Sequence, residues 1–316
     1  MMEKFGHSTN GSQVVEAFKD VVIGKTFLIT GPSDGGIGAE TATCLAAGSP
    51  SLIIFAGRSL PKIQPVIDRI HSINPQVKTK FISVDLSSQA SVREAAANIN
   101  ASVKKIDVLI NNAAIMACPF AKTVDGIESQ FGTNYIGHFL LANLIMPEMF
   151  NAGHGARIVN VSSSAHRFAD VRLDDWNFED GAVYNPLVAY GAAKTANVLF
   201  SLALTQKLKN KHVESISLNP GSIRTNLQTY MTDEMRQKSV ELYKAQTGRS
   251  FTMPERKTIE QGCSTSLVAA LDPSITSGSY LEDCNVAEPE TYATDREKAQ
   301  QLWVLSEKLV GQKFDW

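Results

Sequence analysis

Tyr190 and Lys194 are the pair of residues whose types and spacing are best suited to chemistry in this sequence. The segment around them is typical of a helix, and residues four apart on a helix lie on the same face, one turn apart. A free tyrosine has a pKa of about 10, so proton transfer near neutral pH requires a downward shift of about 3 units, or roughly 4 kcal/mol. A lysine ammonium about 5 Å away favours the phenolate by roughly 3 kcal/mol at an effective dielectric constant of about 20. Because the same spacing is common on solvated helix faces, the rest of the chain must decide between the two interpretations.

A glycine-rich loop over residues 30–38 follows the first predicted strand and precedes a predicted helix. A loop in this position directs backbone N–H groups and a helix N-terminus toward an anion such as a pyrophosphate. The loop lacks the G-x-G-x-x-G pattern, and Ile37 and Gly38 replace the Lys-Ser/Thr of a Walker loop, which disfavours phosphoryl transfer. Asp34 adds a negative charge, and we expect its side chain to point away from the phosphates and to cap the following helix.

The end of the second predicted strand indicates which nucleotide binds. In folds of this kind an acidic residue there binds a free ribose 2′-hydroxyl. Gly57 and Arg58 occupy that end here, and the stretch contains no acid. A guanidinium pairs with a 2′-phosphate through two hydrogen bonds, so the sequence favours NADP(H) over NAD(H).

Short apolar strands alternate with helices along the chain. Strands that are apolar on both faces predict a parallel sheet with helices on each side. We therefore expect an α/β fold, a Rossmann-type doubly wound parallel sheet of about seven strands, in a single domain over residues 1–316. The expected strands span residues 25–30, 52–56, 78–84, 106–110, 157–161, 213–218 and 279–281. The expected helices span residues 12–20, 37–47, 62–73, 88–102, 126–150, 188–210, 258–271 and 294–310.

Composition excludes several classes of protein. Apolar residues make up 43% of the chain and charged residues 20%, with a net charge of −2, which is ordinary for a soluble globular protein. The chain has no block of lysines and arginines that would bind the phosphate backbone of a nucleic acid. The four cysteines are scattered, so neither a zinc site nor a disulfide framework is expected. The polar N-terminus and the lack of a run of about 18 apolar residues predict a cytoplasmic protein without a membrane span.

The motifs, in their order, resemble those of the short-chain dehydrogenase/reductase family over residues 20–285. The family's T-G-x3-G-x-G element is similar to residues 30–38, which contain one extra residue. Its N-N-A-G element is similar to residues 111–114, where Ala114 replaces the glycine, and its P-G element to Pro220 and Gly221. Within the family, the chain is most similar to the retinol-dehydrogenase and WW-domain-oxidoreductase-like group, and to soluble fungal members, several of which serve secondary metabolism. Residues 137–141, 161–166, 194–199 and 280–284 carry that closer likeness.

The resemblance implies a role for each catalytic residue. Tyr190 exchanges a proton with the substrate oxygen, Lys194 lowers the pKa of Tyr190 and binds the nicotinamide ribose, and Ser163 hydrogen-bonds the same substrate oxygen. Asn134 holds a water that relays protons to Lys194. Because side chains alternate along a strand, Ser162 and its counterpart at position 164 face away from the side of Ser163. The implied cofactor-binding residues are Gly31, Ser33, Gly36, Ile37, Gly38, Arg58, Asp85, Leu86, Asn112, Tyr190, Lys194, Pro220, Gly221, Ile223 and Thr225.

Two further stretches receive an interpretation. Residues 1–20 form an N-terminal extension, and residues 222–256 form a substrate lid whose Met231, Met235, Tyr243 and Phe251 suit a bulky apolar ligand. Ordinary helix packing explains these four side chains almost as well. His138 and His166 have no cluster of partners in the sequence, so a metal site or a general base is not favoured for either.

The prediction is an NADP(H)-dependent oxidoreductase that interconverts a ketone or aldehyde and an alcohol on a hydrophobic small molecule, with reduction favoured. The alternatives are an NADP-sensing or scaffolding protein and a non-redox lyase or cyclase on the same fold. The resemblance leaves a monomer and a homodimer open, the latter pairing through residues 126–150 and 188–210.

Overall fold

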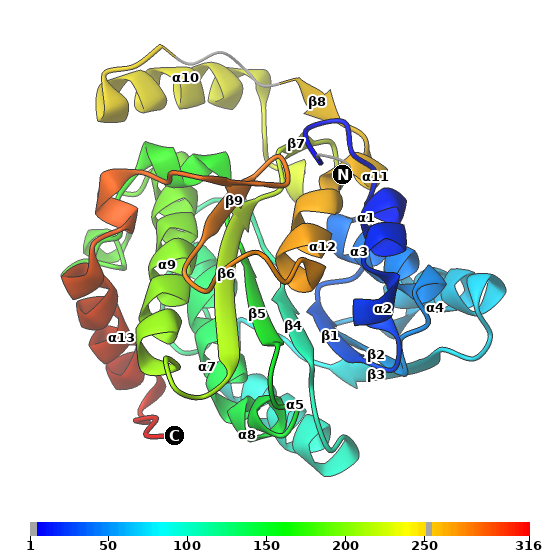
Figure 1. The fold of residues 1–316 in the computed structure, drawn as a ribbon. Helices are drawn as coiled ribbons and strands as arrows, with labels where there is room; N and C mark the ends of the chain where they lie inside the picture. The colour runs from blue at the N-terminus through cyan, green and yellow to red at the C-terminus, as the bar shows by residue number, and fades with distance from the viewer. Residues whose placement is uncertain (1–4, 251–254) are drawn as a thin grey trace.

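A mostly parallel sheet forms the centre of the molecule, as Figure 1 shows. The computed structural model describes residues 5–250 and 255–316, and within them the main sheet has eight strands in the order β10-β9-β6-β5-β4-β1-β2-β3. All neighbouring pairs run parallel except β9 and β10. The predicted Rossmann-type fold is therefore confirmed. The strands are β1 Thr26–Thr30, β2 Leu52–Gly57, β3 Lys78–Ser83, β4 Val108–Asn111, β5 Ala156–Val161, β6 Val213–Asn219, β9 Tyr280–Glu282 and β10 Asn285–Ala287.

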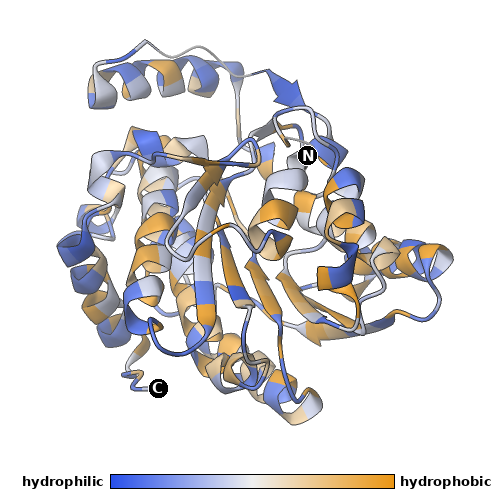
Figure 2. Ribbon diagram, viewed as in Figure 1, coloured by the Kyte–Doolittle hydropathy of each residue, from blue (hydrophilic) through white to orange (hydrophobic). Residues whose placement is uncertain are grey.

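Helices cover both faces of the sheet because its strands are apolar on both faces. Along β1, Phe27 and Ile29 belong to one core cluster and Leu28 to the other. Figure 2 shows the apolar strands between helices that carry polar residues outward. One layer consists of α1 Gly11–Ala17, α2 Lys19–Val22, α3 Ile37–Ala47, α4 Leu60–Ile73, α11 Ile259–Gly262 and α12 Ser264–Leu271. The other consists of α5 Gln89–Ser102, α6 Ser129–Phe131, α7 Gly137–Leu144, α8 Met146–Phe150, α9 Pro186–Lys207 and α13 Arg296–Val310.

The eighth strand, β10, is absent from the sequence prediction. It returns antiparallel to β9 through a two-residue turn at Asp283 and Cys284, whose φ angles are 46° and 65°. Such turns usually carry Asn-Gly or Asp-Gly, because glycine and asparagine tolerate positive φ. A turn made by Asp-Cys gives no recognisable hairpin signal.

The helix predicted over residues 126–150 is broken in the structure. Gly132–Ile136 forms a π-helix between α6 and α7, and Pro147 lies in the first turn of α8. Proline has no backbone N–H to donate, so it belongs at the start of a new helix rather than inside a continuing one. The π-helix places Asn134 in a widened turn, a feature that is frequent at functional sites.

The N-terminal segment is part of the core. Val14 and Val15 of α1 are buried against α3 and α12. Gly11 approaches so closely that a Cβ there would lie 2.3 Å from the Cys263 sulfur. Residues 11–22 therefore form two short helices, α1 and α2, that belong to the helical layer of α3 and α12 and do not extend away from the protein.

The two ends of the predicted lid, residues 222–256, lie side by side on the main body of the protein. Its first strand, β7 Ser222–Ile223, pairs with its last, β8 Arg256–Lys257. Between them lie the 3-10 turn Asn226–Gln228 and α10 Asp233–Thr247, which Figure 1 shows above the carboxyl ends of the strands. Phe251, one of the four lid residues named above, lies outside the described residues.

The C-terminal helix α13 packs on the helices through which a homodimer, one of the two states left open above, would pair. Trp303 of α13 is buried, and its ring lies 4.9 Å from Phe139 of α7 and 6.1 Å from Phe200 of α9, centroid to centroid. In the described part of the chain, α9 is the helix whose length and hydropathy would suit a membrane span, and 89% of that window is buried inside the protein.

Candidate active site

Every predicted site residue outside the helices lies at the carboxyl edge of the sheet. Segments that follow β1, β2, β3, β4, β5 and β6 supply them in turn. In sheets of this kind, ligands bind at that edge, where the strand order reverses, here between β1 and β4. The π-helix brings Asn134 to the same edge, and α9 brings Tyr190 and Lys194. Ile37 and Gly38 lie there too, in the first turn of α3.

α9 places Tyr190 and Lys194 one turn apart, as predicted. The helix begins after Asn185, whose side chain accepts hydrogen bonds from the N–H groups of Leu187 and Val188, with Pro186 at its first position. Tyr190 and Lys194 are both buried, and the lysine Nζ lies 5.7 Å from the centre of the tyrosine ring.

Two of the three consecutive serines after β5, Ser162 and Ser163, have different partners. Ser163 hydrogen-bonds Tyr190 and also accepts a bond from the Ala165 N–H at 3.1 Å. Ser162 is buried on the other side, where its hydroxyl donates to the Lys194 carbonyl oxygen at 2.7 Å. Ser163 is therefore the serine placed beside the tyrosine, and its catalytic role stays a prediction.

Burial sets the protonation of the pair. It raises the pKa of Tyr190, and the hydrogen bond with Ser163 opposes the rise. Burial lowers the pKa of Lys194 from 10.5 to about 7, and its Nζ donates to the Val161 carbonyl oxygen at 2.8 Å. Desolvation of the phenolate is thus the largest cause acting on the Tyr190 pKa in the protein chain, and the expectation that Lys194, together with a cationic cofactor ring, lowers that pKa stays a prediction.

Asn134 is fixed by hydrogen bonds on its side chain. Its Oδ1 accepts from the Ile115 N–H, and its Nδ2 donates to the Ile115 carbonyl oxygen, both at 2.8 Å. Its own carbonyl oxygen bonds His138 Nδ1 at 3.0 Å. These contacts join the π-helix to the segment after β4.

The glycine loop has the shape of an anion-binding turn. Gly31 has a φ of 64° and lies so close to Ala113 that a Cβ would be 2.8 Å from its Cα, so glycine is required there. α3 begins at Ile37, and its N-cap, Gly36, offers no side chain to the first-turn N–H groups. Nothing lies within 4 Å of the Cβ position of Gly35. An uncapped helix N-terminus with open space before it fits a dinucleotide pyrophosphate.

Asp34 points away from this turn, as expected. Its carboxylate pairs with Arg69 of α4 at 2.8 Å. It does not cap α3, contrary to the second part of that expectation. The extra residue of the loop therefore attaches the loop to α4.

The nucleotide-side residues are arranged along the neighbouring strand ends. Arg58 is exposed after β2, and no carboxylate pairs with it among the described residues. Asp85 accepts two hydrogen bonds from Ser87 on its Oδ1, and Leu86 is buried. Asn112 holds the glycine loop by donating to the carbonyl oxygens of Thr30 and Gly31 at 2.9 and 3.3 Å.

The segment after β6 leads from the site into the lid. Pro220 and Ile223 are buried, and Gly221 has a φ of 100° with its N–H donating to Asn219 Oδ1. A Cβ on Gly221 would lie 3.0 Å from the side chain of Lys257. Thr225 caps the short 3-10 turn that follows.

A small apolar cluster contains Tyr190. Lid residues Met231, Met235 and Tyr243 pack against it, together with Leu227 and Leu242. Its buried members are Met116, Ala117, Ala165, Phe168, Leu187 and Tyr190. Soft sulfur and aromatic side chains of this kind adapt to a bulky apolar ligand.

Two residues of the site were not predicted from sequence. Thr30 and His138 are buried and hydrogen-bonded to each other between Oγ1 and Nε2 at 2.8 Å. His138 follows Asn134 by four residues in continuous helical structure. This spacing, which places the two residues on one helix face, is the feature of the sequence that could have indicated their contact. Among the described residues, no group of three or more His, Cys, Asp or Glu could hold a metal.

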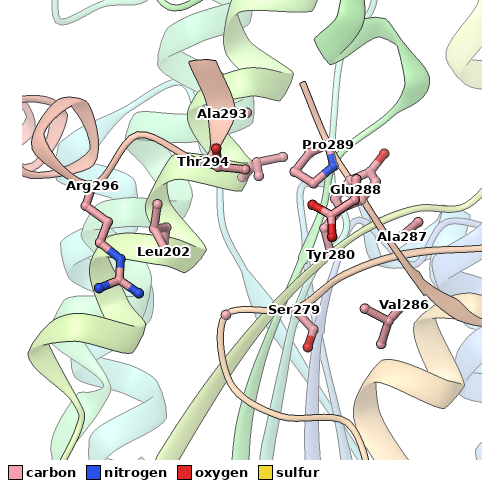
Figure 3. A pocket seen from close by; sticks show the side chains of 12 residues that line it. Leu202, Ser279, Tyr280, Val286, Ala287, Glu288, Pro289, Ala293, Thr294 and Arg296 are labelled. Carbon is pink, nitrogen blue, oxygen red and sulfur yellow. The ribbon is translucent and has the colours of Figure 1, made fainter. Parts of the chain in front are cut away.

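A separate cavity of about 250 Å³ lies between α9, the β9–β10 hairpin and the start of α13. Figure 3 shows Tyr280, Glu288 and Arg296 on its wall. None of its lining residues is a predicted site residue, and we assign it no part in the chemistry of Tyr190.

Comparison with known proteins identifies the family. The family model for short chain dehydrogenases matches residues 25–173. The short-chain dehydrogenase/reductase prx1 of Penicillium roqueforti is 37% identical over 303 residues, which cover 91% of this chain and 85% of that protein. Human retinol dehydrogenase 11 is 35% identical over 294 residues, covering 92% and 87%. A crystal structure of a Mycobacterium paratuberculosis protein superposes with a TM-score of 0.71 at 30% identity, covering 93% and 96%. The chain therefore belongs to the short-chain dehydrogenase/reductase family, oxidoreductases that bind a nicotinamide cofactor and act on alcohols or carbonyls.

Proposed function

We propose that the protein is an NADP(H)-dependent reductase of ketones or aldehydes on bulky apolar small molecules. The observation that carries this proposal is the juxtaposition of Tyr190, Ser163 and Lys194, with apolar side chains of the proposed lid packed against the cluster that contains Tyr190. A reduced nicotinamide bound beside them would supply the hydride to the carbonyl carbon. The chain's own residues supply the proton and the orientation.

Tyr190 is the proposed acid. Its raised pKa keeps the phenol protonated at neutral pH, so it can donate its proton to the substrate oxygen as that oxygen becomes an alkoxide. Ser163 hydrogen-bonds the same oxygen and stabilises the developing charge.

Lys194 is the proposed source of the replacement proton. A pKa of about 7 means that it exists in both protonation states near neutral pH. A group in that condition can give and regain a proton without a large free-energy cost. Asn134 is proposed to hold the water that connects this lysine to solvent.

The preference for NADP(H) is supported by Arg58, whose guanidinium is exposed at the end of β2 and pairs with no carboxylate among the described residues. The preference for an apolar substrate is supported by the Met-rich cluster that packs against the tyrosine. We propose residues 222–256 as the lid of that pocket within a single domain.

The experiment is the loss of NADPH absorbance with a panel of alkyl and aryl ketones and aldehydes of increasing apolar size, with NADH in parallel. Tyr190→Phe removes the acid, and we expect kcat to fall by about 100-fold or more. Tyr292→Phe is the matched control, because Tyr292 also loses a hydroxyl hydrogen bond, to the His166 carbonyl oxygen, outside the site.

Full activity in Tyr190→Phe would contradict the proposal. A parent protein that binds NADPH but turns over none of the panel would instead favour a sensor or a non-redox lyase on this fold.

A further inference from the structure

A chain of buried hydrogen bonds links the glycine loop to Asn134 through His138. Thr30 at the end of β1 and His138 on α7 are both fully buried. The Thr30 Oγ1 lies 2.8 Å from His138 Nε2, and His138 Nδ1 lies 3.0 Å from the Asn134 carbonyl oxygen. The histidine therefore spans two segments that both border the site.

The partners of Thr30 determine the direction of each bond. Its hydroxyl oxygen accepts from the N–H groups of Asn112 and Ala113 at 2.9 and 3.0 Å. A hydroxyl has two lone pairs and one hydrogen, so both acceptor positions are occupied and only the hydrogen remains. The nearer acceptor for that hydrogen is His138 Nε2, since the Ile110 carbonyl oxygen lies 3.4 Å away.

The tautomer of His138 follows from this inventory. Nε2 accepts from Thr30 and must be unprotonated, so the ring proton of the neutral histidine is on Nδ1. Nδ1–H then donates to the Asn134 carbonyl oxygen. In the opposite tautomer the Nδ1 lone pair would face that oxygen's lone pairs, and the contact would be repulsive.

The surroundings also keep His138 neutral. Burial lowers its pKa to about 4, and the nearby charge of Lys194 on α9 acts in the same direction, against the hydrogen bond to Asn134. The groups that contact the ring from β1 and from its own helix, Thr30 and Asn134, carry no charge. The histidine therefore acts as a fixed donor and acceptor and not as an acid or a base.

We propose that His138 is a positioning residue for proton delivery, which holds the Asn134 carbonyl oxygen at a fixed place relative to the Thr30 end of the glycine loop. This inference rests on the proposed function, in which Asn134 orients the water that serves Lys194. With the Asn134 side chain bonded to Ile115 and its carbonyl oxygen bonded to His138, the residue is fixed at both ends. Displacement of a positioned group by about 1 Å can lower a rate by about 100-fold.

Three variants test the inference. His138→Leu removes both bonds, whereas His138→Gln retains an acceptor for Thr30 and a donor for Asn134. Asn143→Leu is the matched control, because Asn143 lies on α7, is buried and donates to the Phe139 carbonyl oxygen at 2.8 Å away from the site residues. We expect His138→Leu to lower kcat by about 10- to 100-fold, with KM for cofactor and substrate nearly unchanged and an increased solvent deuterium isotope effect. His138→Gln and Asn143→Leu should stay within a few-fold of the parent.

A spectroscopic measurement makes the inference independent of turnover. In the parent protein without ligands, nitrogen-15 NMR should show a histidine protonated on Nδ1 that does not titrate between about pH 5.5 and 9 and whose signal is missing in His138→Gln. A similar signal is expected for His166, whose Nδ1 lies 2.7 Å from the Ser163 carbonyl oxygen and whose Nε2 accepts from the Glu290 N–H, and it should remain in His138→Gln. An Nε2-protonated or titrating His138 would overturn the inference even if His138→Leu fails to fold. It would also be overturned if His138→Leu were as active as Asn143→Leu, or lost cofactor affinity in parallel with kcat. A parent protein that reduces no carbonyl would count against the proposed function, and the tautomer would still be decided by NMR.

Discussion

Arg58 is the residue on which the proposed preference for NADP(H) rests. It follows β2, where an acid would bind ribose hydroxyls, and its guanidinium is exposed. Charge-assisted hydrogen bonds to a phosphate contribute roughly 1.5–3 kcal/mol. The other residues of the nucleotide side, such as Asp85 and Asn112, do not distinguish the two cofactors.

We therefore expect Arg58→Asp to raise KM for NADPH by about 10- to 100-fold, because it removes the cation and adds a negative charge next to the 2′-phosphate. KM for NADH should stay the same or fall, since the new carboxylate can accept from ribose hydroxyls. Arg296→Asp, which changes the net charge equally at the exposed start of α13, is the control. Initial rates with both cofactors measure the effect, and an unchanged preference for NADPH would remove the case for Arg58.

The positions of the proposed catalytic residues could be predicted from the sequence, but their pKa values could not. Tyr190 and Lys194 are four apart on one helix, so their common face follows from helix geometry alone. Their pKa values depend on how deeply segments distant in sequence bury them. Burial raises the pKa of Tyr190 and lowers that of Lys194, and both shifts favour the neutral form of the side chain. The hydrogen bonds of His138 could not be predicted either, because they depend on how α7 packs against the end of β1.

Residues 222–256 are the proposed lid, whose apolar side chains pack against the cluster that contains Tyr190. Its two ends are held together by the β7–β8 pair, and Lys257 of β8, whose side chain is almost wholly buried, forms an ion pair with Asp283 at 2.6 Å. The sequence indicated the lid's Met residues but not α10, because this helix is largely polar and Ser239 is its fully buried residue. A helix with only a few apolar residues on one face shows little of the hydrophobic periodicity from which helices are predicted.

Met235 on α10 provides the test of the lid. Met235→Ala removes apolar contact area beside Tyr190, and roughly 25 cal/mol per Å² of lost burial predicts a rise in KM of about 10-fold for large apolar ketones. KM for NADPH should not change, because the residue packs on the substrate side. Lys238→Ala on the exposed face of the same helix is the control. Equal KM values in the two variants, measured by steady-state kinetics, would show that α10 does not border the substrate.

At the scale of the whole molecule, α13 completes the helical layer. The sequence predicted a helix over residues 294–310, close to the observed Arg296–Val310, because its apolar period is regular. Where the helix docks could not be predicted, since its partners are α7 and α9, far away in the sequence. Arg93 of α5 fixes its end by donating to the Val310 carbonyl oxygen at 2.8 Å, and Tyr135 bonds Ser306 at 2.6 Å. The chain thus covers with its own C-terminus the face that a homodimer of the expected kind would use.

Trp303 tests whether this cover belongs to the folded core. Its ring contacts those of Phe139, Phe200 and Trp316 edge-on or tilted, and Lys207 Nζ lies 4.5 Å above it. Trp303→Ala should lower the free energy of unfolding by about 3–5 kcal/mol, because a large buried ring leaves a cavity. Val304→Ala, at a neighbouring residue that is 56% exposed, should change it by about 0.5 kcal/mol or less. Urea unfolding measures the difference, and size-exclusion chromatography of Trp303→Ala should show association through the uncovered α7–α9 face. Equal midpoints for the two variants would mean that α13 does not stabilise the fold, and the face beneath it would again be available for a partner subunit.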